Sequence, residues 1–396
     1  MSVSDTIRPV IDRAQRRALV VAAIGIIATL ALGLRDWTQF FHSYLFAFVY
    51  WMTFAMGPLA FLQLHHLTGG KWGLPLRRIL EAGTRTIPVM LVLFLPLLAG
   101  IKRLYPWAAD PSMLGSEPSD AFRRFWLQPG FFIVRAFVYF AVWILLSSLY
   151  NKWSRQQDQT ADLSLKNKMT VLAGPGIILW SLAWSWAMVD WVMSLEPLWF
   201  SSIYGMIFMV ISLLTAVCLC VLMLRMLDSY QPLHDSYDPP RLNDIGNFML
   251  VFTLLWTYMS FAQFLIIWSG NLKQEIPWYK TRAFSSWGYI AASLLILHFF
   301  VPFFILLQRR VKRRLERLSI IAFWMLVISL VDVYWLVVPA FHNQQNGPHV
   351  SPVDICAVVG IGGIWVSAFM GQLKKMPLLP LHDPRFEGVM EHSHGD

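Results

Sequence analysis

Ionisable residues embedded in apolar runs are the features of this sequence that could carry out chemistry. Between Trp186 and Met206 the chain reads WAMVDWVMSLEPLWFSSIYGM, which sets Asp190 and Glu196 among tryptophans, methionines and aliphatic residues. A charged side chain at the centre of a lipid bilayer costs about 2.5–3.5 kcal/mol on insertion scales, so such residues are candidates for a functional role. Desolvation and nearby arginines both change the proton affinity of a buried carboxyl group, and a proton relay needs groups of adjustable affinity.

The sequence predicts a proton path made of groups of this kind. In the predicted topology the carboxylates and one arginine lie in the outer half of the membrane, and the histidines lie progressively closer to the cytoplasm. The candidate titrating groups are Asp190, Asp332, Arg135, Glu196, Asp354, His298, His65 and His66. The hydroxyl and amide side chains that could connect them are Tyr258, Ser260, Gln263 and Tyr334.

Several of these candidates also have a purely structural interpretation, and the sequence leaves both interpretations open. Arg135 and Asp190 could simply neutralise one another as partners on adjacent helices. Glu196 could belong to the first turn of a short interfacial helix. His298 could bond to a backbone carbonyl in the core, and Asp354 could be a first-turn acid that interacts favourably with a helix dipole.

The elements that must hold these residues are predicted from composition and hydropathy. The chain is 57% hydrophobic and 14% charged, and its mean hydropathy of +0.53 lies far from that of a soluble domain. A lipid-spanning helix needs about 20 mostly apolar residues, and ten runs qualify. They are Ala18–Leu34, Phe40–Leu64, Thr86–Leu104, Phe131–Tyr150, Met169–Val192, Ser202–Leu227, Ile245–Ser269, Ser285–Leu307, Leu318–Phe341 and Val353–Leu373. Because these runs do not alternate as barrel strands do, the predicted fold class is all-α, a polytopic integral membrane protein.

Positive charge is distributed unevenly over the loops, and this distribution predicts the orientation. The chain has 32 Lys and Arg residues and a net charge of +9, and most basic residues fall in segments on the side of both termini. Arg77, Arg78 and Arg85 are counted here as loop residues. The positive-inside rule then places both termini in the cytoplasm. The run RRVKRRLER from Arg309 is predicted to face anionic lipid, and no nucleic acid is expected as a partner.

Several kinds of site are excluded by the residues that the sequence lacks. Cys218, Cys220 and Cys356 do not have the spacing of an iron–sulfur cluster, a zinc site or a c-type haem attachment. A b-type haem needs two axial ligands deep in the membrane, and only His298 lies deep within a predicted span. We therefore expect that the chain itself binds no metal, haem or cluster. The sequence has no nucleotide-binding motif, so this chain alone is not an ATP-driven pump.

Two alternatives to a proton path remain open. A stand-alone secondary transporter often contains helices broken near mid-membrane, and Met56-Gly57-Pro58, Gly174-Pro175-Gly176 and Gly360 to Gly363 could be such breaks. The same small residues could instead allow close helix packing. The second alternative is a structural scaffold subunit whose buried charges only pair.

The loops are consistent with one transmembrane domain over residues 1–396. The segment from Tyr105 to Pro129 is rich in proline and tryptophan, and it predicts an outer lid that could dock a periplasmic partner. A linker from Asp228 to Asp244 divides the predicted spans into groups of six and four. Residues 374–396 are predicted to form a flexible cytoplasmic tail.

Three motifs in the same order along the chain resemble a known family. They are DWVMSLEPLWFSSIYGM from Asp190, FLQLHHLTGGKWG from Phe61, and SFAQFLIIWSGN from Ser260 followed by EIPWY. These stretches resemble the F subunit of Alternative Complex III, a bacterial quinol:cytochrome c oxidoreductase. The resemblance implies an NrfD-like fold, related to polysulfide-reductase membrane subunits. Two four-helix bundles would cover residues 40–192 and 202–341, with extra helices beside them.

The resemblance also implies partners and a role. The partners would be a paralogous C membrane subunit, a periplasmic iron–sulfur B subunit and c-type cytochrome subunits, so haem c and iron–sulfur clusters would lie in neighbouring chains. A quinone or menaquinone is the one small molecule that this chain itself could bind. The implied role is proton conduction coupled to quinol oxidation in a neighbouring subunit, in the bacterial inner membrane.

Overall fold

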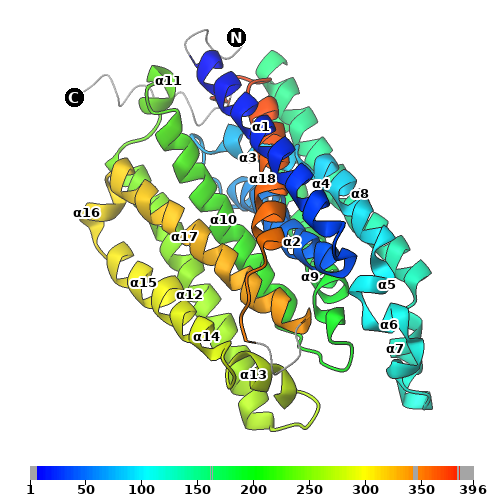
Figure 1. Cartoon of the computed structure of the whole chain (residues 1–396). Coiled ribbons are helices and arrows are strands. Elements are labelled where there is room, and N and C mark those ends of the chain that lie inside the picture. The colour runs from blue at the N-terminus through cyan, green and yellow to red at the C-terminus, as the bar shows by residue number, and fades with distance from the viewer. Residues whose placement is uncertain (1–6, 161, 163, 342–346, 381–382, 384–396) are drawn as a thin grey trace.

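The structure is a computed structural model that describes residues 7–160, 162, 164–341, 347–380 and 383. These residues form helices and connecting turns, and no strand occurs among them. Ten helices in this part of the chain are long and apolar enough to cross a membrane. The predicted fold class is therefore confirmed: the protein is an all-α, multi-pass membrane protein (Figure 1).

The spanning helices extend beyond the predicted apolar runs at most ends. They are α1 (Arg8–Gly33), α2 (Trp37–Thr68), α3 (Arg77–Thr84) with α4 (Ile87–Ala99), α8 (Pro129–Thr160), α9 (Ser164–Trp191), α10 (Tyr204–Met226), α12 (Pro239–Gly270), α14 (Gly288–Leu294) with the π-helix η4 (Leu295–Phe300) and α15 (Val301–Leu306), α17 (Leu315–Val337) and α18 (Pro352–Leu373). The short helices of the connections are α5 (Ile101–Leu104), α6 (Pro106–Ala109), η1 (Pro111–Leu114), η2 (Pro118–Asp120), α7 (Ala121–Trp126), η3 (Met193–Leu195), α11 (Gln231–His234), α13 (Ile276–Arg282), α16 (Arg309–Lys312) and η5 (Val338–Phe341).

Helix α2 is the centre of the molecule. Of its most apolar 18-residue window, 94% is buried inside the protein, and it packs against α3, α9, α10 and α18. Gly57 permits the approach of α10, because a Cβ atom there would lie 1.8 Å from the carbonyl oxygen of Ser212. Both α2 and α9 run without interruption through their Gly-Pro motifs. At Gly57 the small residue therefore serves close packing and does not break the helix.

Helix contacts divide the described spans into two groups and a flanking pair. Helices α2, α3–α4, α8 and α9 pack with one another, and so do α10, α12, α14–α15 and α17. The contact between α2 and α10 joins the two groups, and α1 and α18 pack together beside α2. Gly25 on α1 and Gly360 on α18 let these two backbones touch.

The two ends of the helix assembly hold different connections. Figure 1 shows α11, α16 and the first turns of α1 at one end, and α6, α7 and α13 at the other. We name these the terminal end and the loop end. Since successive spans alternate in direction, α3 begins and α8 ends at the terminal end, whereas α9 ends and α10 begins at the loop end.

The structure corrects two expectations about charged and terminal segments. Arg77 and Arg78 are not loop residues, because the third span begins at Arg77 and both side chains are buried in α3. The predicted flexible tail is wrong for residues 374–380 and for Asp383. Met376, Leu378 and Leu379 are buried, and Asp383 pairs with Arg77. The rest of the predicted tail, 381–382 and 384–396, lies outside the described residues.

Candidate functional site

Arg135 on α8 and Asp190 on α9 meet at the loop end and form a two-pronged ion pair. The Nε atom of Arg135 lies 2.8 Å from Oδ2 of Asp190, and its Nη2 atom lies 2.9 Å from Oδ1. The hydroxyl of Tyr139 donates to Oδ2 at 2.8 Å, and Nε1 of Trp126 donates to Oδ1 at 2.9 Å. Four donated hydrogen bonds and one opposite charge hold the carboxylate, and we call these four residues the Asp190 cluster.

Aromatic rings hold the guanidinium of Arg135 in place. Its Cζ atom lies 4.1 Å from the ring centroid of Trp126 and 4.4 Å from that of Phe131, both within cation–π range. Its Nη1 atom also donates to the backbone carbonyl of Trp126 at 2.9 Å. The end of α7 therefore covers the ion pair and keeps water from it.

Tyr105 ties the loop after α5 to the same region. Its hydroxyl donates to the backbone carbonyl of Trp191 at 3.0 Å, one residue beyond Asp190. Burial, and then the negative charge of Asp190, raise the pKa of Tyr105 well above its ordinary value of 10.0. The hydroxyl therefore stays a neutral donor at any physiological pH.

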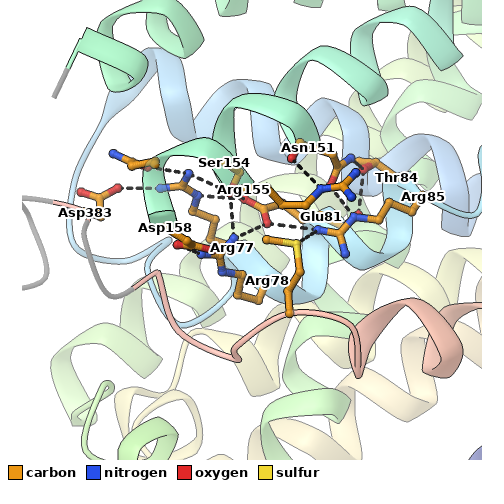
Figure 2. Close-up of polar contacts among 12 residues, drawn as sticks. Arg77, Arg78, Glu81, Thr84, Arg85, Asn151, Ser154, Arg155, Asp158 and Asp383 are labelled. Carbon is orange, nitrogen blue, oxygen red and sulfur yellow. Dashed lines mark hydrogen bonds and ion pairs between the residues drawn. The ribbon is translucent and has the colours of Figure 1, made fainter. Parts of the chain in front are cut away.

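A second charged cluster lies at the terminal end, between α3 and α8 (Figure 2). Glu81 is 1% exposed and accepts contacts from three arginines. Its oxygens lie 2.9 Å from Nε of Arg77, 2.7 Å from Nη1 of Arg78 and 3.5 Å from Nη2 of Arg85. The hydroxyl of Ser154 on α8 donates to Oε1 of Glu81 at 2.6 Å.

Two further carboxylates complete this group, which we call the Glu81 cluster. Arg78 pairs with Asp158 on α8, and Nη1 of Arg77 lies 2.7 Å from Oδ2 of Asp383. Figure 2 shows the four charged side chains of α3 and its C-cap directed toward α8 and the C-terminal segment. The sequence reading missed this cluster. The spacing of its charged residues could have indicated it, because residues 77, 81 and 85 are four apart and share one helix face.

His65 and His66 lie at the end of α2, close to the Glu81 cluster. Both are buried. The ring of His66 stacks on Tyr150 of α8, with centroids 5.5 Å apart and 6° between the planes. His65 packs edge-on against Trp72. Since Tyr150 precedes Asn151, which donates to Thr84 of α3 at 2.9 Å, the histidines adjoin the polar region of the terminal end.

One face of α8 connects the two clusters. Arg135, Tyr139, Trp143, Ser147 and Asn151 follow at intervals of four residues and therefore share this face. The first two belong to the Asp190 cluster, and the last two bond to the end of α3.

An aromatic layer separates the polar segments of this helix face. The ring of Trp143 lies 5.8 Å from that of Trp184 and 6.0 Å from that of Trp191, and all three side chains are buried. Phe94 and Phe140 extend the layer on α4 and α8. The face is therefore polar at both ends and aromatic in the middle.

Asp332 and His298 occupy a separate site among α12, η4 and α17. Nε1 of Trp256 donates to Oδ2 of Asp332 at 2.8 Å, and the ring of His298 lies 4.0 Å from that of Trp256. Nε2 of His298 is 3.4 Å from the hydroxyl oxygen of Ser329. All four side chains are buried, and among the described residues Asp332 has no ion pair. We call this set the Asp332 cluster.

The π-turn of η4 presents His298 to the Asp332 cluster. A π-turn inserts one extra residue into a helix, and such turns often occur at functional sites. Here the turn covers Leu295–Phe300, and His298 is its one buried residue.

Glu196 and Asp354 lie apart from these clusters. Glu196 pairs with the buried Arg282 of α13 at 2.7 Å, so it is more than a turn residue. Asp354 forms a capping box with Ser351 at the start of α18, as its structural interpretation predicted. It also accepts a hydrogen bond from the hydroxyl of Ser43 at 2.6 Å, which ties α18 to α2.

The predicted connecting side chains do not form one series of steps. Tyr258 is 65% exposed on the outer side of α12, and its side chain lies outside the three clusters. Gln263 accepts from Ser201 at 2.9 Å near the loop end, and the hydroxyl of Tyr334 donates to the carbonyl of His349. The single ladder expected from the sequence is therefore three separate clusters.

The chain matches no protein-family model and no curated protein. Within the described ranges, no group of three or more His, Cys, Asp or Glu side chains could hold a metal ion.

Proposed function

We propose that this protein is a non-haem subunit of a bacterial respiratory complex that oxidises quinol, and that it conducts protons coupled to quinol oxidation in a neighbouring subunit. One observation carries the proposal. The face of α8 that holds Arg135 and Tyr139 at the loop end also holds Asn151 and Ser154 at the terminal end, with Trp143 between them. Buried charge in contact with both ends of one helix face is costly in a membrane and is typical of a proton path.

The chemistry available at each end suits proton exchange. At the terminal end, the hydroxyl of Ser154 contacts Glu81 directly, and Asp158, whose side chain is 18% exposed, is the carboxyl group that can exchange a proton with water. At the loop end, the hydroxyl of Tyr139 contacts Asp190 and can pass a proton to or from it. Both sets of hydrogen bonds are shorter than 3 Å, so transfer needs no large displacement of the donors.

The aromatic layer around Trp143 gives such a path a barrier. Protons move along water or along groups that both accept and donate hydrogen bonds, and the indole N–H groups of the buried Trp143, Trp184 and Trp191 can only donate. A path of this kind conducts only when the layer is transiently hydrated. We propose that a change in the neighbouring quinol-oxidising subunit causes this hydration, which couples proton movement to electron transfer.

The Asp332 cluster provides a second exchange site in the other helix group. Asp332 is buried beside His298, and among the described residues it accepts one hydrogen bond, from the neutral donor Trp256. No arginine among the described side chains pairs with this carboxyl group. It can therefore change protonation at a smaller electrostatic cost than Asp190 or Glu81, which are paired with arginines. Asp332 is therefore the residue most suited to bind and release a proton.

We place the terminal end in the cytoplasm, in the bacterial inner membrane. Exposed arginines concentrate at the start of α1 and around α16, and basic residues of membrane proteins are retained on the cytoplasmic side. The loop end then faces the periplasm, where the iron–sulfur subunit and the c-type cytochromes would bind. The paralogous membrane subunit would pack beside this chain within the bilayer.

Quinone binding is a second candidate function, and one observation favours it. A hollow of about 280 Å³ lies at the loop end beside the Asp190 cluster, and its walls include Phe122, Trp126, Trp186 and Phe200. Aromatic walls suit a planar quinone ring. Quinone that co-purifies with wild-type protein and is lost from a Trp186→Ala variant would support this function, and equal retention would contradict it.

Isolation from native membranes in mild detergent tests the proposed function. We expect a tagged chain to co-purify with c-type cytochromes, visible by their haem absorption, and with iron–sulfur subunits, and the preparation to reduce cytochrome c with quinol. An isolated oligomer of this chain that lacks both would contradict the proposal and favour a stand-alone transporter. A complex whose proton stoichiometry is unchanged by substitutions in the clusters would instead favour a structural scaffold.

A further inference from the structure

A hollow between spanning helices lies next to the Glu81 cluster at the terminal end. Its volume is about 290 Å³, and its walls come from the junction of α3 and α4, from α8, and from the segment that follows α18. Arg85, Arg155 and Lys375 contribute three positive charges to the walls. We call this hollow the basic slot.

The walls of the basic slot change from apolar to cationic along α8. Ile144, Ser148, Asn151 and Arg155 lie on one face of the helix, at intervals of three or four residues, and all of them line the slot. The sequence of groups is thus aliphatic, hydroxyl, amide and guanidinium. Pro88 of α4 is exposed and lies on the opposite wall. This gradient matches a phospholipid, in which acyl chains precede a polar, negatively charged headgroup.

The polar wall of the slot is held in position before any ligand binds. Nε of Arg85 donates to Oδ1 of Asn151 at 2.6 Å, and its Nη1 atom donates to the carbonyl of Gln372 at 3.4 Å. Nε of Arg155 donates to the carbonyl of Asn151 at 3.3 Å. A ligand would therefore meet arginines whose rotamers are already restricted, which lowers the entropic cost of binding.

The charges around the slot are not balanced within the described part of the chain. The slot and the Glu81 cluster together hold three carboxylates, Glu81, Asp158 and Asp383, against four arginines and one lysine, namely Arg77, Arg78, Arg85, Arg155 and Lys375. Positive charge is therefore in excess beside the membrane. Arg85 is the most distant arginine partner of Glu81, at 3.5 Å, and its Nη1 atom makes only a long hydrogen bond, 3.4 Å, to the carbonyl of Gln372.

We propose that the basic slot binds the phosphate headgroup of an anionic phospholipid. The phosphate oxygens would accept hydrogen bonds from the guanidinium groups of Arg85 and Arg155 and from Lys375, and the acyl chains would pass along Pro88 and Ile144. Basic pockets between spanning helices on the cytoplasmic side are a recognised type of site for such headgroups. The bound lipid would offset the excess positive charge beside the Glu81 cluster. This inference does not depend on the proposed role in proton conduction.

The test measures lipid binding to the full-length protein in nanodiscs or detergent. Delipidated wild-type protein should be stabilised against thermal unfolding by cardiolipin or phosphatidylglycerol, but not by phosphatidylcholine or by inorganic phosphate at the same concentration. An R155Q/K375Q variant removes two of the three cations without touching Glu81. Its apparent affinity for the anionic lipid should fall about tenfold or more, since each basic residue near an anionic surface contributes on the order of 1 kcal/mol.

Two further variants keep the proposal falsifiable. Ser148→Trp fills the slot without changing charge and should also abolish binding, whereas R310Q/R314Q removes two exposed arginines at α16 and should leave the affinity within about twofold. Each variant is first melted without lipid to show that it is folded. Equal affinity of wild-type and R155Q/K375Q proteins, or an equal loss in R310Q/R314Q, would overturn the assignment. If inorganic phosphate stabilises the protein as much as the anionic lipid does, the ligand of the slot is a free anion and the proposed lipid is contradicted.

Discussion

Arg135 and Asp190 form a buried two-pronged ion pair, with N–O distances of 2.8 and 2.9 Å and exposed fractions of 7% and 1%. The pair fixes α8 to α9 at the loop end, and Tyr139 and Trp126 complete the hydrogen bonds of the carboxylate. Removing one member of a buried pair leaves the other charge uncompensated, which costs far more than the pair contributes. This asymmetry decides how variants of the cluster must be designed.

Asp190→Asn should lower the free energy of unfolding by about 3–5 kcal/mol, because the guanidinium of Arg135 stays buried without a counter-charge. The double variant R135Q/D190N removes both charges and keeps neutral hydrogen-bonding groups. It should recover most of the lost stability. Thermal or denaturant unfolding in detergent micelles measures both effects. The cost of the double variant is compared with the costs of Arg135→Gln and Asp190→Asn measured singly. If the two single costs simply add up to the cost of the double variant, the two side chains do not interact, which would contradict the ion pair.

Glu81→Gln should destabilise the protein more than Asp158→Asn. Glu81 contacts three arginines and is fully enclosed, whereas Asp158 pairs with Arg78 and its side chain is 18% exposed. We expect a loss of about 3–5 kcal/mol for Glu81→Gln and a smaller loss for Asp158→Asn. The same unfolding assay compares them. The reverse order would contradict the assignment of Glu81 as the centre of the cluster.

Tyr258→Phe should change neither stability nor proton movement. The side chain is 65% exposed on α12, and the structure gives its hydroxyl no hydrogen bond to a described residue. Substitutions at such surface positions usually stay within about 0.5 kcal/mol. A clear fall in proton translocation in this variant would restore Tyr258 to the path and contradict the division into three clusters.

Tyr105→Phe should remove a hydrogen bond worth about 1 kcal/mol and change the response to alkaline pH. Because burial and Asp190 raise the pKa of Tyr105 well above 10.0, the folded protein keeps this proton after the unfolded chain has lost it. The contribution of the group is complete below pH 10 and declines as the pH rises further. Wild-type stability should therefore fall more steeply above pH 10 than that of Tyr105→Phe. Identical slopes would contradict the burial of this hydroxyl.

The sequence was sufficient to predict the ten spans, and it offered the pairing of Arg135 with Asp190 as one of two interpretations. Apolar runs of membrane length are long and unambiguous signals. A lone arginine and a lone aspartate at the same predicted depth on consecutive spans have few other ways to be neutralised. Both predictions depend on patterns that lie along the chain.

Predictions that depended on which face of a helix is buried were less reliable. Tyr258 lies only two residues after Trp256, yet Trp256 faces Asp332 and Tyr258 faces outward. An almost uniformly apolar helix gives no periodic signal for which side is buried. Arg77 and Arg78 were counted as loop residues for a related reason. Their partners, Ser154 on α8 and the distant Asp383, become apparent only in three dimensions.

The proton-to-electron ratio of the intact complex tests the central claim most directly. The complex would be reconstituted in vesicles with quinol and cytochrome c, and proton movement and cytochrome c reduction would be recorded together. With R135Q/D190N, or with Asp332→Asn, we predict that the ratio falls by half or more while electron transfer keeps most of its rate. Tyr258→Phe should match the wild type. An unchanged ratio in both the R135Q/D190N and the Asp332→Asn complexes would contradict the proposal that these buried groups conduct protons.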